Sequence, residues 1–401
     1  MRVTKLETIT VDAYPNLIWV HVHTDEGLVG LGETFFGPEA VAAHVHNFIA
    51  PYLLGQNAFD IERHSHNMTG YTGRGGSGAE MRAMSAVDIA LWDIWGQAIG
   101  QPIHKALGGT SRDKVKVYNT CAGYEYVKKA AAQTTANFGL TSQAGPYEDL
   151  QGFLERPEEV AQSLLDMGIG AMKIWPFDFA AVASQGASIS AADMNTALEP
   201  FRRIREAVGD RIGIMAELHS LWNIPVAKQI CQALEEFDLT WIEDPVRMDV
   251  PSQVARVARA TSTPIAGGEL LGQRFQFGEL LRQADIGVGI MDVVWAGGLT
   301  EARKVASLCD SHGVPFAAHD CTGPVALAAS THIAMHAPNV FTQEIVRAFY
   351  YGWYGDLVTE LPLVEKGYIS ASEAAGLGMA LQADLLKQTG THLRSTEAKD
   401  L

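Results

Sequence analysis

The stretch from Gly213 to Glu344 contains apolar runs that each end in one acidic side chain or histidine, and this pattern constrains the fold more than any other. Three of these runs end at Glu217, Glu243 and Glu269, in equal steps of 26 residues. One strand-and-helix unit of a parallel barrel takes about 30 residues. The spacing therefore predicts a β/α barrel with the three carboxylates at equivalent strand ends.

The carboxyl ends of barrel strands lie on one face, so we expect Glu217, Glu243 and Glu269 to converge. Convergent carboxylates repel one another and need a compensating positive charge. A hard divalent cation with oxygen ligands supplies that charge, and Mg²⁺ keeps positions open for substrate oxygens. A single strand-end acid is more often a helix cap. Because three acids recur at equal spacing, we predict a Mg²⁺ site, with Mn²⁺ as the alternative ion.

The same spacing continues through Asp292, His319 and Glu344, in steps of 27 and 25 residues. An acid and a histidine on neighbouring strand ends form a hydrogen-bonded pair that orients the imidazole and increases its basicity. We therefore predict that Asp292 and His319 pair beside the metal. His219 follows Glu217 by two residues, so an extended backbone would direct both side chains to the same side.

The order of these motifs resembles the mandelate racemase branch of the enolase superfamily. The resemblance rests on Glu217, on Glu243 with Asp244 and Pro245, on Gly268 with Glu269, on the run from Asp292 to Glu301, and on Ala318 with His319. It extends to the segments 85–93, 107–109 and 376–378, which resemble the capping domain and C-terminal return of that family. It implies an α/β fold, a modified (β/α)7β TIM barrel with an α+β capping domain.

This resemblance also implies the domain organisation. We expect an N-terminal capping domain over 1–113, a catalytic barrel over 114–345 and a C-terminal return to the cap over 346–401.

Local patterns predict several elements within these domains. Two β-rich runs on either side of residues 25–27 predict a hairpin. Apolar residues at helical spacing predict helices over 39–50 and 79–98. We expect a strand pair over 361–369 that returns to the cap, and a polar, mobile tail from Gln388 onward.

The predicted second barrel strand carries Lys173, and Trp175 stands where the family has the second lysine of a lysine-x-lysine pattern. In relatives that second lysine is a base on one face of the substrate. Tryptophan cannot accept a proton, so two-base racemisation is disfavoured. We expect Lys173 to hold the substrate carboxylate and Trp175 to contact the substrate. A role of Lys173 as a base stays open.

The acid-x-histidine pattern of Glu217 and His219 resembles the acid-sugar dehydratases, in which the histidine protonates the departing hydroxyl. The resemblance implies a carbon-oxygen lyase of carbohydrate catabolism, in which His319 removes the proton beside the carboxylate and a 2-keto-3-deoxy acid results. Glu344 resembles the family's eighth-strand acid, which would hydrogen-bond the substrate. Arg74, in a glycine-rich loop, is a candidate contact for a distal substrate group, with a solvated side chain as the alternative.

Three other functions stay open. A cycloisomerase, an intramolecular lyase, would use the same residues to break the ring ether of an anhydro- or lactone-type sugar acid. An epimerase or racemase needs a base on each face of the substrate, which Trp175 weakens. A sugar-acid-binding pseudoenzyme would keep the fold without needing His319.

Composition restricts the partners. The formal net charge of −16 disfavours nucleic acid and anionic membranes, which attract basic surfaces. The chain shows neither an apolar run long enough for a membrane span nor a signal-peptide pattern. Its four cysteines lack a CxxC pair, which favours reduced thiols in a cytoplasmic protein. We expect a small-molecule sugar acid as substrate, and the resemblance implies a homo-oligomer.

Overall fold

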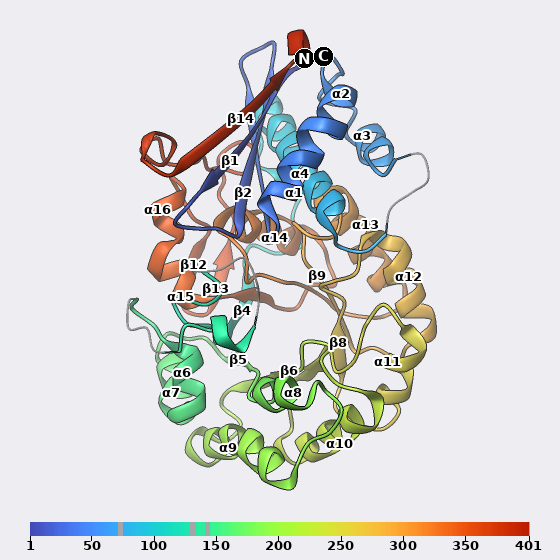
Figure 1. Ribbon diagram of the computed structural model, residues 1–401, viewed down its shortest axis with the longest axis vertical. Helices are drawn as coiled ribbons and strands as arrows, with labels where there is room; N and C mark the ends of the chain where they lie inside the picture. The colour runs from blue at the N-terminus through green and yellow to red at the C-terminus, as the bar shows by residue number, and fades with distance from the viewer. Residues whose placement is uncertain (71–74, 129–133, 141–144, 401) are drawn as a thin grey trace.

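Two units make up the fold, a cap that holds both chain termini and a barrel that lies beside it (Figure 1). The computed structural model describes residues 1–70, 75–128, 134–140 and 145–400. The barrel is the predicted (β/α)7β type, and a strand-rich cap covers it, so the predicted fold class is confirmed.

The cap is built on an antiparallel sheet in the order β14-β1-β2-β3. Its strands are β1 (Val3–Val11), β2 (Leu17–Thr24), β3 (Val29–Phe35) and β14 (Thr391–Glu397). The predicted hairpin is β2 with β3. The prediction of a mobile tail was wrong, because β14 pairs with β1 from Lys5 opposite Glu397 to Val11 opposite Thr391. These backbone hydrogen bonds complete a sheet edge that would otherwise be exposed.

Helices cover one face of the cap sheet. The cap helices are α1 (Pro38–His44), η1 (Val45–Ile49), α2 (Ala50–Leu53), α3 (Ile61–Met68), α4 (Ala79–Ile99) and α5 (Ile103–Ala106), of which α3 and α5 pack on other helices. The long helix α4 packs directly on β3, because two strand glycines let the backbones approach. A Cβ atom at Gly32 would lie 1.8 Å from the carbonyl oxygen of Ala86, and one at Gly30 would lie 2.0 Å from that of Ala90.

Eight parallel strands of the described chain form the barrel. They are β4 (Val115–Thr120), β5 (Ala171–Ile174), β6 (Gly213–Glu217), β7 (Trp241–Glu243), β8 (Ile265–Gly267), β9 (Val288–Met291), β10 (Phe316–Ala318) and β11 (Gln343–Ile345). The strands pair in chain order from β4 to β10, and β11 pairs with β4. Phe316 of β10 bridges to Val340, which precedes β11 and closes the ring.

Helical segments connect successive barrel strands and form the outer layer (Figure 1). They are η2 (Thr135–Asn137), α6 (Asp149–Glu155), α7 (Pro157–Asp166), α8 (Asp178–Ser184), α9 (Ala191–Val208), α10 (Ile224–Leu234), η3 (Glu235–Phe237), α11 (Pro251–Ala258), α12 (Gln273–Gln283), α13 (Gly298–Ser311) and α14 (Pro324–His336). After β11 come α15 (Arg347–Phe349), η4 (Tyr350–Tyr354), α16 (Gly355–Leu357), η5 (Leu385–Lys387) and η6 (Ala398–Asp400).

The predicted strand pair near the C-terminus exists, but it does not join the cap. Strands β12 (Leu363–Glu365) and β13 (Tyr368–Ser370) form an antiparallel pair, and β13 pairs with β4 through Tyr368 opposite Lys116 and Ile369 opposite Val115. The start of β4 is free to accept this partner, because β5 pairs only with its last two residues. Long-range pairing of this kind leaves no local signal in the sequence.

Apolar side chains fill the barrel interior. Tyr118 and Trp241 meet edge to face with ring centroids 5.2 Å apart. Apolar residues without aromatic rings complete the cluster on the other strands, namely Met215, Ala266, Val288, Ile290 and Ala317. Such a packed interior leaves the carboxyl ends of the strands as the place for polar chemistry.

Acidic side chains of the cap bind the first turns of two barrel helices. Asp88 Oδ2 accepts the Thr300 N–H of α13 at 2.9 Å, and Glu33 Oε1 accepts the Ala326 N–H of α14 at 2.9 Å. Burial raises the pKa of Asp88 to about 7 and that of Glu33 to about 8. Hydrogen bonds at helix N-termini thus fix the cap over the barrel.

The cysteines and helices give two further observations. All four cysteines are free thiols. None of the helices in the described part of the chain is long and apolar enough to cross a lipid bilayer.

Candidate functional site

Three glutamates converge at the carboxyl ends of neighbouring barrel strands. Glu217 and Glu243 are the last residues of β6 and β7 and are partners in the parallel register. Glu269 lies two residues beyond β8, after Gly267 and Gly268, which have φ angles of 153° and 120°. One ligand atom from each glutamate lies within 4.8 Å of the others. The glycine pair, whose φ values suit residues without a Cβ atom, brings Glu269 to the other two acids.

Lys173 of β5 lies among these acids. Its Nζ atom is 2.7 Å from Glu243 Oε1, 3.0 Å from Glu344 Oε1 and 3.5 Å from Glu217 Oε2. Burial opposes the charge on Lys173, but Glu243 and Glu344 outweigh it and raise its pKa well above the usual value. Lys173 is therefore an ammonium ion that compensates part of the negative charge.

One ammonium ion does not balance the acids around it. Burial, together with the charges of Glu217 and Glu344, raises the pKa of Glu243 well above its usual value, while Trp241 Nε1 donates to Glu243 Oε2 at 2.8 Å. Burial and Glu217 also raise the pKa of Glu269. A buried set of carboxylate oxygens with unbalanced charge fits the preferences of a hard divalent cation.

His319 and Asp292 form a buried pair next to Glu269. His319 follows β10 directly and Asp292 follows β9. His319 Nδ1 lies 2.7 Å from Asp292 Oδ2, and Val294 N–H donates to Asp292 Oδ1 at 2.8 Å. The other imidazole nitrogen, Nε2, lies 3.1 Å from Glu269 Oε2. The pair thus directs Nε2 of His319 toward the glutamate cluster.

His219 forms a second histidine–carboxylate pair, with Asp178. His219 Nδ1 lies 2.8 Å from Asp178 Oδ2. Burial opposes the charge on His219, but Asp178 and Glu217 outweigh it and raise its pKa to about 10. The carboxylate thus favours the protonated form of this imidazole.

The prediction that an extended backbone brings His219 beside Glu217 was wrong. Strand β6 ends at Glu217, and His219 and Ser220 are in the left-handed region with φ angles of 49° and 59°. The backbone is therefore not extended there. Glu217 Oε1 instead accepts the N–H of His219 at 2.7 Å, and this tight turn keeps His219 beside the cluster.

Glu344 and Trp175 also lie at the site. Glu344 is within β11, where its carboxylate accepts hydrogen bonds from the Thr120 hydroxyl and, at 2.9 Å, from Asp320 N–H. Trp175 follows β5, and its ring meets that of His219 edge to face at 5.9 Å. Arg74 lies outside the described residues.

A cavity joins these side chains. The sequence-predicted residues that line it are Lys173, Trp175, Glu217, His219, Glu269, His319 and Glu344. Other lining residues were not predicted, namely Phe35, Phe36, Thr120, Tyr126, Val127, Trp295 and Cys321. Glu243 and Asp292 lie behind this lining, against Lys173 and His319.

Asp178, Phe35 and Phe36 are examples of residues at this place that the sequence did not identify. Asp178 stands in the first turn of α8, where acids are common because they stabilise the helix. The one further signal in the sequence is its position five residues after Lys173. Phe35 and Phe36 come from the end of the cap hairpin and enter the barrel cavity through domain docking. Their apolar character alone gives no signal of this role.

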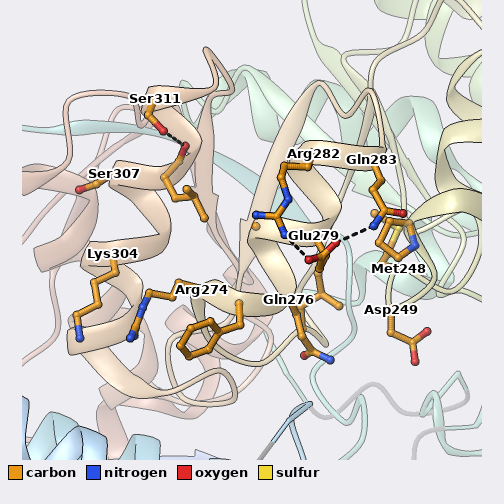
Figure 2. A pocket seen from close by; sticks show the side chains of 15 residues that line it. Met248, Asp249, Arg274, Gln276, Glu279, Arg282, Gln283, Lys304, Ser307 and Ser311 are labelled. Carbon is orange, nitrogen blue, oxygen red and sulfur yellow. Dashed lines mark hydrogen bonds and ion pairs between the residues drawn. The ribbon is translucent and has the colours of Figure 1, made fainter.

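A larger hollow lies on the outer surface over α12 and α13, away from the site acids (Figure 2). Its charged side chains pair locally. Arg282 contacts Glu279, Arg274 contacts Glu301, and Lys304 lies 3.3 Å from the same Glu301. The charges in this hollow are therefore paired, whereas the carboxylates at the barrel strand ends are not fully balanced.

Comparison with protein families covers most of the chain. The family described as "Enolase C-terminal domain-like" matches residues 156–385. The family described as "Mandelate racemase / muconate lactonizing enzyme, N-terminal domain" matches residues 4–108.

Relatives and solved structures match over almost the whole length. D-xylonate dehydratase of Haloferax volcanii is 30% identical over 388 residues, which covers 96% of this chain and 88% of the relative. D-galactonate dehydratase of Xanthomonas oryzae pv. oryzae is 30% identical, with 97% and 94% covered. The crystal structure of an enolase of the mandelate racemase subgroup from Agrobacterium tumefaciens is 45% identical, with a TM-score of 0.89 and 100% of both chains covered.

Proposed function

The chain belongs to the mandelate racemase and muconate lactonizing enzyme family of the enolase superfamily, and from this premise we propose that it dehydrates a sugar acid to a 2-keto-3-deoxy acid. One observation carries the proposal. Two histidine–carboxylate pairs, His319 with Asp292 and His219 with Asp178, lie beside the cluster of three glutamates. β-Elimination needs both a base and an acid, and we assign one of these roles to each pair.

Glu217, Glu243 and Glu269 would hold the cation, and their all-oxygen donor set favours Mg²⁺ over ions that prefer nitrogen or sulfur. When bound, Mg²⁺ supplies positive charge that stabilises the negative charge developing on the substrate carboxylate. Mn²⁺ has similar ligand preferences and is the alternative.

His319 is the proposed base. Asp292 fixes Nδ1, so Nε2 is the nitrogen that takes the proton from C2 of the substrate. Lys173 would lie against the substrate carboxylate and stabilise the enediolate that proton removal creates. Glu344 keeps the ammonium group in place through its 3.0 Å contact with Nζ, and it would itself hydrogen-bond the substrate.

His219 is the proposed acid. The C–O bond at C3 breaks, the departing hydroxyl takes the proton of His219 and leaves as water, and the electron pair from C2 forms the C2=C3 double bond. The resulting enol tautomerises to the 2-keto-3-deoxy acid. Asp178 stabilises the protonated imidazole before the transfer.

Two relatives support a sugar acid as the substrate, because one is named D-xylonate dehydratase and the other D-galactonate dehydratase. We propose an aldonic acid with a free hydroxyl at C3. Trp175 is the proposed contact for the sugar chain, because its ring lines the cavity and packs on His219.

The test is a screen of an acid-sugar library with the wild type and His319→Asn, followed by the product mass. We expect one or a few acids to lose one water with the wild type and none with the variant. A product of unchanged mass would instead indicate the cycloisomerase, and inverted substrate that has gained deuterium would indicate the epimerase. If no acid turns over, or if His319→Asn is as active as the wild type, the proposal is wrong.

A further inference from the structure

A second group of metal-ligating side chains lies on the cap sheet, apart from the barrel cavity. Glu7 of β1 and His21 and His23 of β2 each offer one ligand atom, and these atoms all lie within 4.8 Å of one another. Glu7 Oε2 is 2.6 Å from His23 Nε2 and 3.9 Å from His21 Nδ1. None of the three lines the barrel cavity.

Sheet register explains why these three side chains meet. Glu7 is the direct partner of His21 in the antiparallel pair, and Lys5 is the direct partner of His23. His21 and His23 are two residues apart on one strand, so both imidazoles stand on the same face as Glu7. The rings are edge to face with centroids 6.0 Å apart, so they approach the carboxylate from different directions.

The surroundings allow an ion to enter and leave. The side chains are 11% exposed at Glu7, 16% at His21 and 22% at His23. Lys5 Nζ lies 2.6 Å from Glu7 Oε1 and therefore occupies the oxygen that does not face the imidazoles. A partner of this kind orients a ligating carboxylate, much as outer hydrogen bonds do in known metal sites.

The donor set selects a different ion from that of the barrel. Two imidazole nitrogens and one carboxylate oxygen suit borderline ions such as Zn²⁺, Co²⁺ and Ni²⁺, whereas Mg²⁺ prefers oxygen ligands alone. We propose that Glu7, His21 and His23 bind one borderline transition-metal ion on the cap, with water completing its coordination. This site links β1 to β2 and is independent of the proposed dehydration.

Co²⁺ is the probe for the test, because nitrogen ligation gives it visible absorption bands that oxygen ligation in the barrel does not match. Metal-free protein is titrated with Co²⁺ in a large excess of Mg²⁺, and bound cobalt is counted by elemental analysis. We expect one equivalent with nitrogen-type bands in the wild type, loss of that equivalent in His21→Gln and His23→Gln, and displacement by Zn²⁺.

His392→Gln is the matched control, because His392 Nε2 also contacts a carboxylate, Asp12 Oδ1 at 2.8 Å, on the same sheet but without a second imidazole. This variant should keep the equivalent. Far-UV circular dichroism verifies that each variant folds. If a histidine variant does not fold, Glu7→Gln, which preserves side-chain size, takes its place as the ligand variant in the test. The proposal is overturned if the wild type shows no such bands, if His21→Gln and His23→Gln keep them, or if His392→Gln loses them. Catalytic activity does not enter this readout, so failure here leaves the proposed function untouched.

Discussion

Asp178 Oδ2 lies 2.8 Å from Nδ1 of His219, so the proposed acid is held in the same way as the proposed base, His319, whose Nδ1 lies 2.7 Å from Asp292 Oδ2. In both pairs the carboxylate fixes one imidazole nitrogen and leaves Nε2 for chemistry. Each pair can therefore be disrupted by its own substitution. We expect variants of the His319–Asp292 pair to block proton removal and variants of the His219–Asp178 pair to block elimination.

Replacing His219 by Asn should stop elimination but not proton removal. His319 would still exchange the C2 proton, because its contacts to Asp292 do not involve His219. The measurement is turnover in D₂O, in which NMR reports deuterium in recovered substrate and mass spectrometry reports product. We expect dehydration to fall by about 10²–10⁴-fold, the usual contribution of acid–base catalysis, with exchange retained. Equal loss of exchange and dehydration would contradict the separate roles.

Replacing Asp292 by Asn should slow the proton-removal step. An amide at this position no longer stabilises the imidazolium that forms when Nε2 takes a proton. We expect kcat to fall by about 10²-fold or more with little change in KM. Asp310→Asn, at an exposed position on α13, is the control and should be silent. A normal kcat in Asp292→Asn would remove the basis for pairing it with His319.

Removal of divalent ions should abolish turnover. The cluster of Glu217, Glu243 and Glu269 carries more negative charge than Lys173 balances, so the folded protein should also gain stability when Mg²⁺ binds. At a Mg²⁺ concentration 100 times Kd the gain is about 2.7 kcal/mol. Activity after EDTA and the melting temperature with and without Mg²⁺ measure both effects. Turnover that is indifferent to chelator would refute the metal assignment.

The buried imidazole of His332 should make stability fall in mild acid. Burial and neighbouring His104, whose Nδ1 lies 3.0 Å away, lower the pKa of His332 to about 3. Its unfolded pKa is about 6.5. The folded state therefore binds fewer protons between these values, so its stability is complete above pH 6.5 and declines as pH falls toward 3.

This decline is about 1.4 kcal/mol per pH unit. Urea unfolding at pH 7.5 and pH 5 should show a loss in the wild type that exceeds the loss in His332→Gln by about 2 kcal/mol. His312→Gln, at an exposed position, should lose as much as the wild type. Equal losses in the wild type and His332→Gln would show that this imidazole does not couple folding to protons.

Replacing Asp149 by Ala should destabilise the barrel. Arg347 binds it through two hydrogen bonds, Nη2 to Oδ1 at 2.6 Å and Nε to Oδ2 at 2.7 Å, and both side chains are 3% exposed. The variant leaves a buried guanidinium without its carboxylate, which costs about 3–5 kcal/mol. Glu199→Ala removes the exposed pair with Arg202 and should cost at most about 1 kcal/mol. Urea unfolding compares the two, and a similar small loss in both would contradict this reading.

The sequence predicted the positions of those side chains that recur with the strand-and-helix repeat of the barrel. Glu217, Glu243 and Asp292 could be assigned to strand ends because each strand-and-helix unit has nearly constant length. His319 followed by the same argument. These residues stand at equivalent places in successive units, so their separation in the chain encodes their proximity in space.

Two features could not be found in this way, because they depend on contacts between distant parts of the chain. Asp178 contacts His219 because the backbone adopts left-handed φ angles in the turn after β6. The tail pairs with β1, although its polar composition resembles that of a mobile end.

Sequence by itself thus determined the barrel and the residues carried at its strand ends, since these follow from local periodicity. Only the tertiary structure decided how the cap closes over them, through Phe35 and Phe36 at the cavity, and how Glu7 meets His21 and His23 across two strands. The physical reason is that domain docking and cross-strand register depend on which residues of two segments come to lie opposite one another, and the pattern within either segment alone does not record this.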